Sequence, residues 1–197
     1  LCLIGFGEAG GEIARSLEAW RGASTAPLSA LTAFDIKIAQ PDSADLLRRR
    51  MEAVGVGCAA DLATALAGAK MVISVVTADR AHEAAVAAAR HIEAGTLFLD
   101  MNSCAPGTKQ KSAHVIEQAG GLYVDVAVMA PITSAGHRTS MLAASIHGEA
   151  AAALFAAAST ALAVSRANSS SEESFRATSV RQQLTLPELP GKSTVTP

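Results

Sequence analysis

The glycine-rich turn at the start of the chain constrains its fold more than any other feature. Gly5, Gly7 and Gly10 follow an apolar run and open a segment, 8–19, whose apolar residues recur at helical spacing. In such a unit the first glycine permits a tight turn, the second lets a pyrophosphate approach the backbone, and the third lets the helix pack closely. The free N–H groups and positive dipole end of the helix would face that anion. The pattern predicts a loop that binds NADP or NAD through Gly5, Phe6, Gly7, Glu8, Ala9 and Gly10.

Apolar runs of strand length alternate with helical patterns over most of the chain. Such alternation, with short turns, gives right-handed crossovers and a parallel sheet that is buried on both faces. We therefore expect an α/β fold of the Rossmann type, doubly wound around a mainly parallel sheet. The expected strands are 1–5, 29–38, 53–58, 71–76, 96–100, 122–128 and 141–148, and the expected helices are 8–19, 45–53, 62–66, 79–92, 106–118 and 150–162.

The pattern dissolves near the end of the chain. Residues 165–197 contain seven Ser, four Thr and three Pro without sustained periodicity, so they bury too little apolar surface to offset the entropy of ordering. The sequence thus predicts two parts, a NAD(P)-binding domain over 1–164 and a disordered tail over 165–197.

Composition and charge narrow the class of partner. A net charge of −2 with interspersed acids and bases provides no broad positive field for nucleic acid. We find no apolar run of membrane-spanning length and no signal peptide, which favours the cytoplasm. The three cysteines lack CxxC spacing and are expected to be reduced and mostly buried. The histidines lack metal-ligand spacing, so we expect no metal.

The choice between NAD and NADP depends on the end of the second strand. Asp35 lies where an acid usually accepts hydrogen bonds from the adenosine ribose, which favours NAD. It follows Gly10 by more than the usual ~20 residues, and the loop before the strand could absorb the surplus. Lys37 could instead face a 2′-phosphate, and Asp35 could be a solvated turn acid. The sequence leaves both cofactors open.

Three later segments follow the ends of other strands, where the ligand crevice of an open α/β sheet lies. They are VVTAD (75–79), DMNSCAP (100–106) and VDVAVMAP (124–131). Together with the glycine loop they make residues 1–164 resemble the β-hydroxyacid dehydrogenase family, which includes 3-hydroxyisobutyrate and 6-phosphogluconate dehydrogenases. The segments are most similar to those of its threonate-dehydrogenase-like branch.

The resemblance implies an NAD(P)-dependent oxidoreductase with a small hydroxy acid as substrate. Val76 and Thr77 would line the cofactor, and Asn102 and Ser103 would lie near the nicotinamide and the substrate. An amide beside a hydroxyl supplies the neutral donors that a hydroxy acid needs. The alternative is that Asn102 and Ser103 only cap the helix that begins near Pro106.

The chain also departs from the family's pattern. Residues 129–138 replace the family's paired-glycine substrate loop. His137 or Arg138 could supply charge for the substrate acid there, but we expect both to be solvated. The family's catalytic lysine, its helical domain and its dimer contact lie beyond the nucleotide domain, and none of the five lysines matches that lysine. A truncated or frame-shifted product, a non-catalytic or regulatory NAD(P)-binding protein, and an enzyme completed by another chain all fit this pattern. A methyltransferase that binds S-adenosylmethionine is an alternative from another class.

Overall fold

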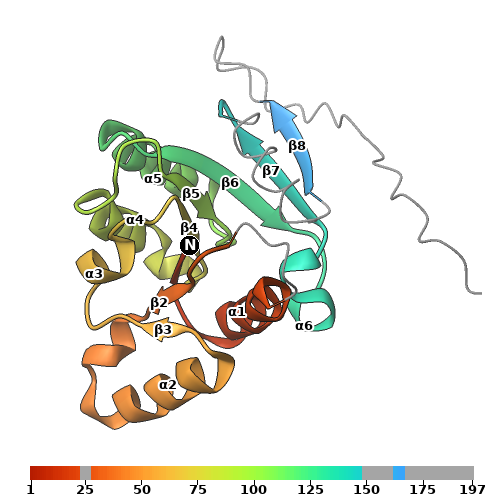
Figure 1. Cartoon of the computed structure of the whole chain (residues 1–197). Coiled ribbons are helices and arrows are strands. Elements are labelled where there is room, and N and C mark those ends of the chain that lie inside the picture. Colours follow the sequence, from red (N-terminus) through yellow and green to blue (C-terminus); the bar gives the residue numbers. More distant parts are fainter. Residues whose placement is uncertain (23–27, 148–161, 167–197) are drawn as a thin grey trace, which may run out of the picture.

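The structure is a computed structural model that describes residues 1–22 and 28–147, together with the backbone of 162–166. In this part of the chain one sheet has the strand order β3-β2-β1-β4-β5-β6-β7-β8 (Figure 1). The strands are β1 (Cys2–Ile4), β2 (Thr32–Phe34), β3 (Gly57–Cys58), β4 (Met71–Ser74), β5 (Leu97–Asp100), β6 (Leu122–Val128), β7 (Met141–Ser145) and β8 (Leu162–Arg166).

Every neighbouring pair of strands is parallel except β6 and β7, which are antiparallel. The chain runs outward from β1 through β2 to β3, then returns to pair β4 with the other side of β1. This reversal puts a topological switch point between β1 and β4, where ligands bind in doubly wound sheets. The expected fold class is confirmed.

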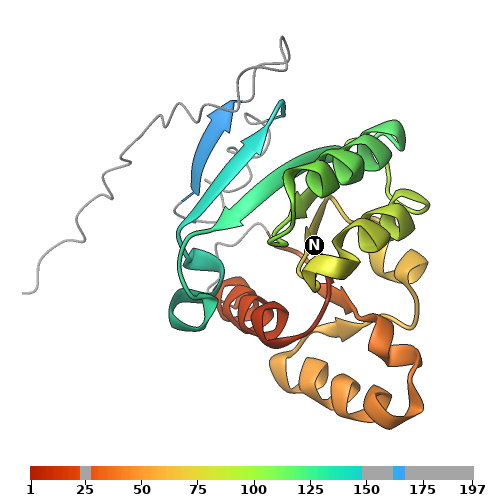
Figure 2. The ribbon, with the colours of Figure 1, turned by 180° about the vertical axis from the view of Figure 1, so that it is seen from behind.

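Helices cover both faces of the sheet, so all three residues of β1 are buried although they point to alternate faces. Leu3 packs into a core with α1 and α2, whereas Cys2 and Ile4 pack into a second core with α3, α4 and α5. The short α6 and the 3-10 turn η3 contact α1 and lie beside it in both views (Figures 1 and 2). The helices are α1 (Glu8–Arg21), α2 (Pro41–Val54), α3 (Leu62–Leu66), α4 (Ala81–Ala89), α5 (Pro106–Gln118) and α6 (Ile132–Ala135), and the 3-10 turns are η1 (Ile36–Ala39), η2 (Ala78–Arg80) and η3 (Gly136–Arg138).

Several element bounds differ from the expectation for local reasons. The second strand stops at Phe34 because Asp35 accepts the Lys37 N–H and starts a 3-10 turn. The helix expected over 45–53 begins at Pro41, whose missing N–H is tolerated in a first turn, and it ends before Gly55, whose φ is +83°. Only two of the residues expected in a strand over 53–58 form β3.

The end of the chain is also different. The helix expected over 150–162 lies outside the described residues except for Leu162, which begins β8. β8 pairs in parallel with β7 at the outer edge of the sheet and extends to Arg166. The tail expected from residue 165 therefore begins inside a strand, and its remainder, 167–197, lies outside the described residues.

The cysteines are free, as expected, but they are not all buried. Cys2 is fully buried, Cys104 is partly exposed, and Cys58 is exposed. The expectation is wrong for Cys58 because it ends the two-residue strand β3 at the edge of the sheet. Within the described residues, no helix is long and apolar enough to cross a membrane, and no cluster of His, Cys, Asp or Glu is placed to hold a metal ion.

Candidate dinucleotide site

The glycine loop connects β1 to α1 at the switch point, and its three glycines differ in what surrounds them. Gly5 has a φ of +97°, and a Cβ there would lie 2.2 Å from the carbonyl oxygen of Val75. A Cβ on Gly10 would lie 2.3 Å from the carbonyl oxygen of Gly5. A Cβ on Gly7 would meet nothing within 4 Å, and Gly7 is the N-cap of α1. Two glycines are thus required by the fold, and the third leaves open space in front of a helix N-terminus.

Asp35 lies next to this loop, although β1 and β2 are far apart in sequence. One oxygen of its carboxylate accepts the Phe6 N–H at 2.8 Å, and the other accepts the Lys37 N–H at 2.9 Å. The extra residues between Gly10 and Asp35 fall between the end of α1 and the start of β2. The carboxylate is partly exposed beside the loop, so the long spacing does not remove it from the site.

Arg50 of α2 also reaches the glycine loop, and sequence reasoning missed it. Its Nη2 donates to the Gly7 carbonyl at 3.2 Å, and its guanidinium lies 5.8 Å from the centre of the buried Phe6 ring. The spacing from Gly7 contains no motif that would signal this contact. Arg50 therefore brings a positive charge to the glycine loop.

The chain segment after β4 completes the crevice. Val75 donates its N–H to the Ile4 carbonyl at 2.8 Å, so this segment continues the pairing with β1 as far as the glycine loop. Val76 is partly exposed and Thr77 is exposed. Val76 donates its N–H to Oδ1 of Asn102 at 2.6 Å, which ties the end of β4 to the end of β5.

Asn102 and Ser103 follow β5 but have different surroundings. The Asn102 side chain is buried, and its Nδ2 donates to Oγ of Ser74 at 3.1 Å and to Oδ1 of Asp100 at 2.7 Å. Ser103 is exposed. The N-cap of α5 is Ala105, and no side chain caps this helix. The alternative that Asn102 and Ser103 only cap the helix is therefore wrong.

An ion-pair network that sequence reasoning missed lies next to Asn102. Lys109 of α5 is 8% exposed, and its Nζ lies 3.1 Å from Oδ1 of Asp100 and 2.8 Å from Oδ1 of Asp125. The hydroxyl of Tyr123 donates to Oδ2 of Asp100 at 2.7 Å. Burial, together with the Asp100 carboxylate, raises the pKa of the Tyr123 phenol far above its ordinary value. Tyr123 therefore keeps its proton and acts as the donor.

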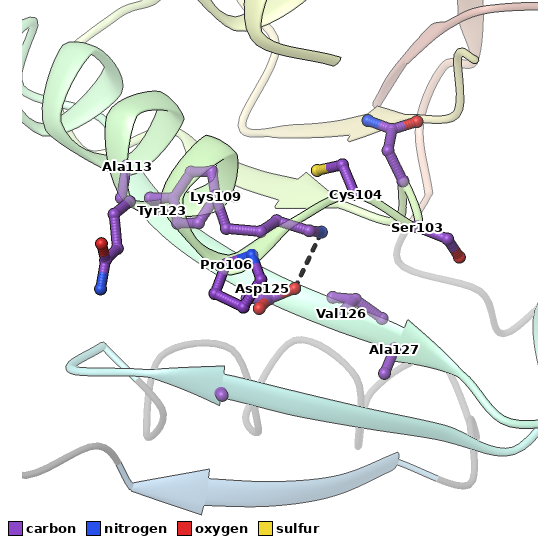
Figure 3. A pocket seen from close by; sticks show the side chains of 12 residues that line it. Ser103, Cys104, Pro106, Lys109, Ala113, Tyr123, Asp125, Val126 and Ala127 are labelled. Carbon is purple, nitrogen blue, oxygen red and sulfur yellow. Dashed lines mark ion pairs between the residues drawn. The ribbon is translucent and has the colours of Figure 1, made fainter. Parts of the chain in front are cut away.

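Beside this network is a cavity of about 320 Å³ between α5, β6 and β7 (Figure 3). Figure 3 shows the ion pair between Lys109 and Asp125 among the residues that line it, with Ser103 and Cys104 on the connection that follows β5. Pro106, Val126 and Ala127 supply much of its apolar wall. The cavity follows the same end of β5 as the dinucleotide crevice, which is where a second, small ligand could meet the cofactor.

The segment after β6 packs against α1 and does not form a glycine-rich anion loop. Gly136 fits closely there, because a Cβ on it would lie 2.3 Å from Cβ of Ser16. His137 is 8% exposed, its Nδ1 lies 2.6 Å from Oγ of Ser16, and its ring lies 5.8 Å from the Trp20 ring. Burial, and to a lesser degree Arg138, lowers the pKa of the imidazole. The expectation that His137 is solvated is wrong, whereas Arg138 is exposed as expected.

The described geometry thus brings the expected site residues to one end of the sheet. Four different connections meet at the switch point, and each of them contacts the next. They contain Gly7, Asp35, Val76 and Asn102. A helix N-terminus with open space in front of it and a carboxylate beside it fits a dinucleotide. The fold and this site define the class of nicotinamide dinucleotide-binding proteins.

Comparisons with known proteins identify the family. The family described as the NAD binding domain of 6-phosphogluconate dehydrogenase matches residues 1–164. The chain therefore belongs to this family, which supports membership of the β-hydroxyacid dehydrogenases, and it is the NAD(P)-binding domain of such a protein. This result removes the methyltransferase alternative. No curated protein matches the sequence.

Several solved structures share the fold of this chain. A conserved hypothetical protein from Sinorhizobium meliloti 1021 is 30% identical with a TM-score of 0.76, over 85% of this chain and 54% of its own. The 3-hydroxyisobutyrate dehydrogenase of Mycobacterium tuberculosis, solved with L-serine, is 18% identical with a TM-score of 0.67, over 84% of this chain and 54% of its own. The imine reductase of Myxococcus stipitatus, solved with NADP+, is 17% identical with a TM-score of 0.63, over 84% and 54%. The chain thus spans about half the length of these proteins.

Proposed function

We propose that the chain is the dinucleotide-binding half of an oxidoreductase that acts on a small hydroxy acid. The open space at Gly7, in front of the α1 N-terminus and beside Asp35, is the observation that carries this proposal. The family assignment supports NADP or NAD as the cofactor. The nucleotide-binding unit would comprise residues 1–164.

Each side of the crevice would bind a different part of the dinucleotide. The backbone N–H groups at the start of α1 bind the pyrophosphate, and Gly5, Phe6, Glu8, Ala9 and Gly10 set the path of the loop around Gly7. Asp35 accepts a ribose hydroxyl, which favours NAD, although Lys37 and Arg50 supply positive charge nearby for a 2′-phosphate. Val76 and Thr77 line the cofactor between its two ends. The bound dinucleotide supplies the hydride acceptor or donor.

The substrate side would be the end of β5 with the adjoining cavity. Ser103 offers an exposed hydroxyl there, and Asn102 shapes the wall between cofactor and substrate. A hydroxy acid also needs a group that accepts the hydroxyl proton, and such a group contributes roughly 10² to 10⁴ in rate. Lys109 is unsuited because its Nζ contacts the Asp100 carbonyl and two carboxylates at 2.7 to 3.1 Å.

We therefore expect the chain alone to bind the cofactor with little or no turnover. The engagement of Lys109 also favours a second candidate function, a non-catalytic or regulatory NAD(P)-binding protein. The cytoplasm is the proposed location, which the three free cysteines support. A small hydroxy acid is the proposed substrate of the oxidoreductase.

Thermal-shift titrations and a turnover assay test the proposal together. NADPH or NADH should raise the melting temperature, since a ligand at a hundred times its Kd stabilises the native state by about 2.7 kcal/mol. S-adenosylmethionine should have no effect. Oxidation of 2- or 3-hydroxy acids at ordinary enzymatic rates by the isolated chain would contradict the expected lack of turnover. The absence of any shift with either dinucleotide would contradict the binding function itself.

A further inference from the structure

Lys109 occupies an unusual position for a lysine. It belongs to the buried side of α5, together with Ser112 and Ile116, whereas Lys111 on the same helix is exposed. Its Nζ has three close oxygen partners, namely the Asp100 carbonyl at 2.7 Å, Oδ1 of Asp100 at 3.1 Å and Oδ1 of Asp125 at 2.8 Å. A buried ammonium is retained only when it is paired in this way. Any effect of Lys109 on the site must therefore act through the two carboxylates that it contacts.

The Asp100 carboxylate that Lys109 contacts also holds Asn102 through hydrogen bonds. Its Oδ1 accepts the Asn102 backbone N–H at 3.0 Å and the Asn102 side-chain Nδ2 at 2.7 Å. Because Nδ2 donates to Asp100 and to Ser74, Oδ1 of Asn102 must point the other way. There it accepts the Val76 N–H at 2.6 Å.

We propose that Lys109 is a positioning residue for the cofactor-lining segment after β4. Its ammonium keeps Asp100 as a hydrogen-bond acceptor, Asp100 fixes the orientation of the Asn102 amide, and that amide holds the backbone of Val76 at the edge of the crevice. The proposal rests on the proposed function in one respect, because Val76 is expected to line the dinucleotide.

Loss of the ammonium has a defined consequence in this arrangement. Asp100 is completely buried, and loss of Nζ removes one of the donors that fix its carboxylate. A carboxylate that turns no longer accepts both N–H groups of Asn102 in their present positions. The Asn102 oxygen would then lose its alignment with the Val76 N–H. The segment after β4 would have to move.

Amide NMR of isotope-labelled protein measures this directly. The Lys109→Met variant removes the ammonium, and Lys111→Met is the matched control on the exposed side of the same helix. In Lys109→Met we expect a shifted Val76 amide signal and about tenfold faster hydrogen exchange at that amide, the loss expected for one hydrogen bond. Lys111→Met should leave both unchanged. A general loss of stability would accelerate exchange throughout the core, so an effect centred on Val76 distinguishes positioning from a structural role.

A second variant provides the test if Lys109→Met does not fold. Lys109→Met combined with Asp125→Asn removes one cation and one anion, so the net charge of the network stays the same while the Nζ donor is lost. It should show the same change at Val76, and the Kd for NADPH or NADH should rise about tenfold in whichever variant folds. A wild-type Val76 amide in either folded variant would overturn the proposal. Failure of both variants to fold would overturn it too, because Lys109 would then be a requirement of the fold.

The same measurements separate this proposal from the proposed function. If Val76 responds as expected but the unaltered protein binds neither dinucleotide, the positioning role holds and the dinucleotide function fails. If the unaltered protein binds a dinucleotide and Val76 does not respond, the reverse conclusion follows.

Discussion

Substitution of Gly7 and Gly10 by alanine should have opposite effects, although both residues belong to one motif. In Gly7→Ala the new methyl group enters open space, because nothing lies within 4 Å of its ideal Cβ position. The φ of −71° at Gly7 suits alanine, and the loss of a favourable N-cap residue is a small cost. The free energy of unfolding should change by no more than about 1 kcal/mol.

The same methyl group should obstruct the cofactor. It stands where the pyrophosphate would approach the N-terminus of α1. Displacement of the anion would lose one hydrogen bond, and such a bond to a charged group contributes about 1.5–3 kcal/mol. The Kd for NADPH or NADH should therefore rise roughly 10- to 100-fold.

In Gly10→Ala the added Cβ lies 2.3 Å from the Gly5 carbonyl oxygen, and neither atom can turn away because both belong to the loop and its helix. Overpacking of this kind costs up to about 3 kcal/mol, and the helix preference of alanine over glycine offsets about 1 kcal/mol. A net loss of about 2 kcal/mol lowers the melting temperature by about 4–8 °C. Calorimetric unfolding and cofactor titration of both variants check the contrast. A wild-type Kd in Gly7→Ala would refute the reasoning, as would a wild-type melting temperature in Gly10→Ala.

Three further predictions concern other parts of the site. Asp35→Ser should weaken NADH binding about tenfold and NADPH binding less, because it removes an acceptor for the 2′-hydroxyl; equal effects in parallel titrations would remove Asp35 from the ribose site, and the exposed Asp45 gives a matched control as Asp45→Ser. Burial lowers the pKa of the folded His137 imidazole below its unfolded value of about 6.5, so stability is fully present above about pH 6.5 and falls as the pH drops further. The melting temperature of His137→Asn should depend less steeply on pH across that range, and an unchanged slope would contradict the burial of the imidazole. Tyr123→Phe leaves the buried Asp100 oxygen without its donor and should cost about 1–3 kcal/mol in urea unfolding; a cost near zero would contradict the network.

The sequence predicted the fold and the end of the sheet at which the candidate site residues lie, because both depend on local patterns. The alternation of strands and helices fixes the connections, and a parallel sheet then places the carboxyl ends of β1, β2, β4 and β5 together. Glycine spacing carries the loop geometry because only glycine tolerates the contacts of Gly5 and Gly10. Asp35 could be placed from its position after β2 despite its long spacing.

The buried network could not be predicted in the same way. Lys109 and Lys111 both look like ordinary helix surface residues, and only the burial of Ser112 and Ile116 shows which side of α5 faces the sheet. Its partners Asp100 and Asp125 come together through the register of β5 with β6, which the sequence does not state. One signal was present, since an Asp ends or interrupts each of two otherwise apolar strands.

The expectations for the segment after β6 and for the residues that form β8 were wrong for a related reason. His137 was expected in solvent because it lies in a loop, but the close approach of Gly136 to Ser16 brings it against α1. β8 exists because β7 offers an edge for pairing, a property of the sheet rather than of residues 162–166. In both cases a contact between residues far apart in the sequence determined the structure.

Binding of a nicotinamide dinucleotide at the glycine loop is measured most directly by isothermal titration of the unaltered chain with NADPH and with NADH, each repeated on Gly7→Ala. We expect saturable binding at one site for at least one dinucleotide, weakened roughly 10- to 100-fold by the Gly7 substitution. Absence of binding for both dinucleotides, or equal affinity in the two proteins, would contradict this expectation.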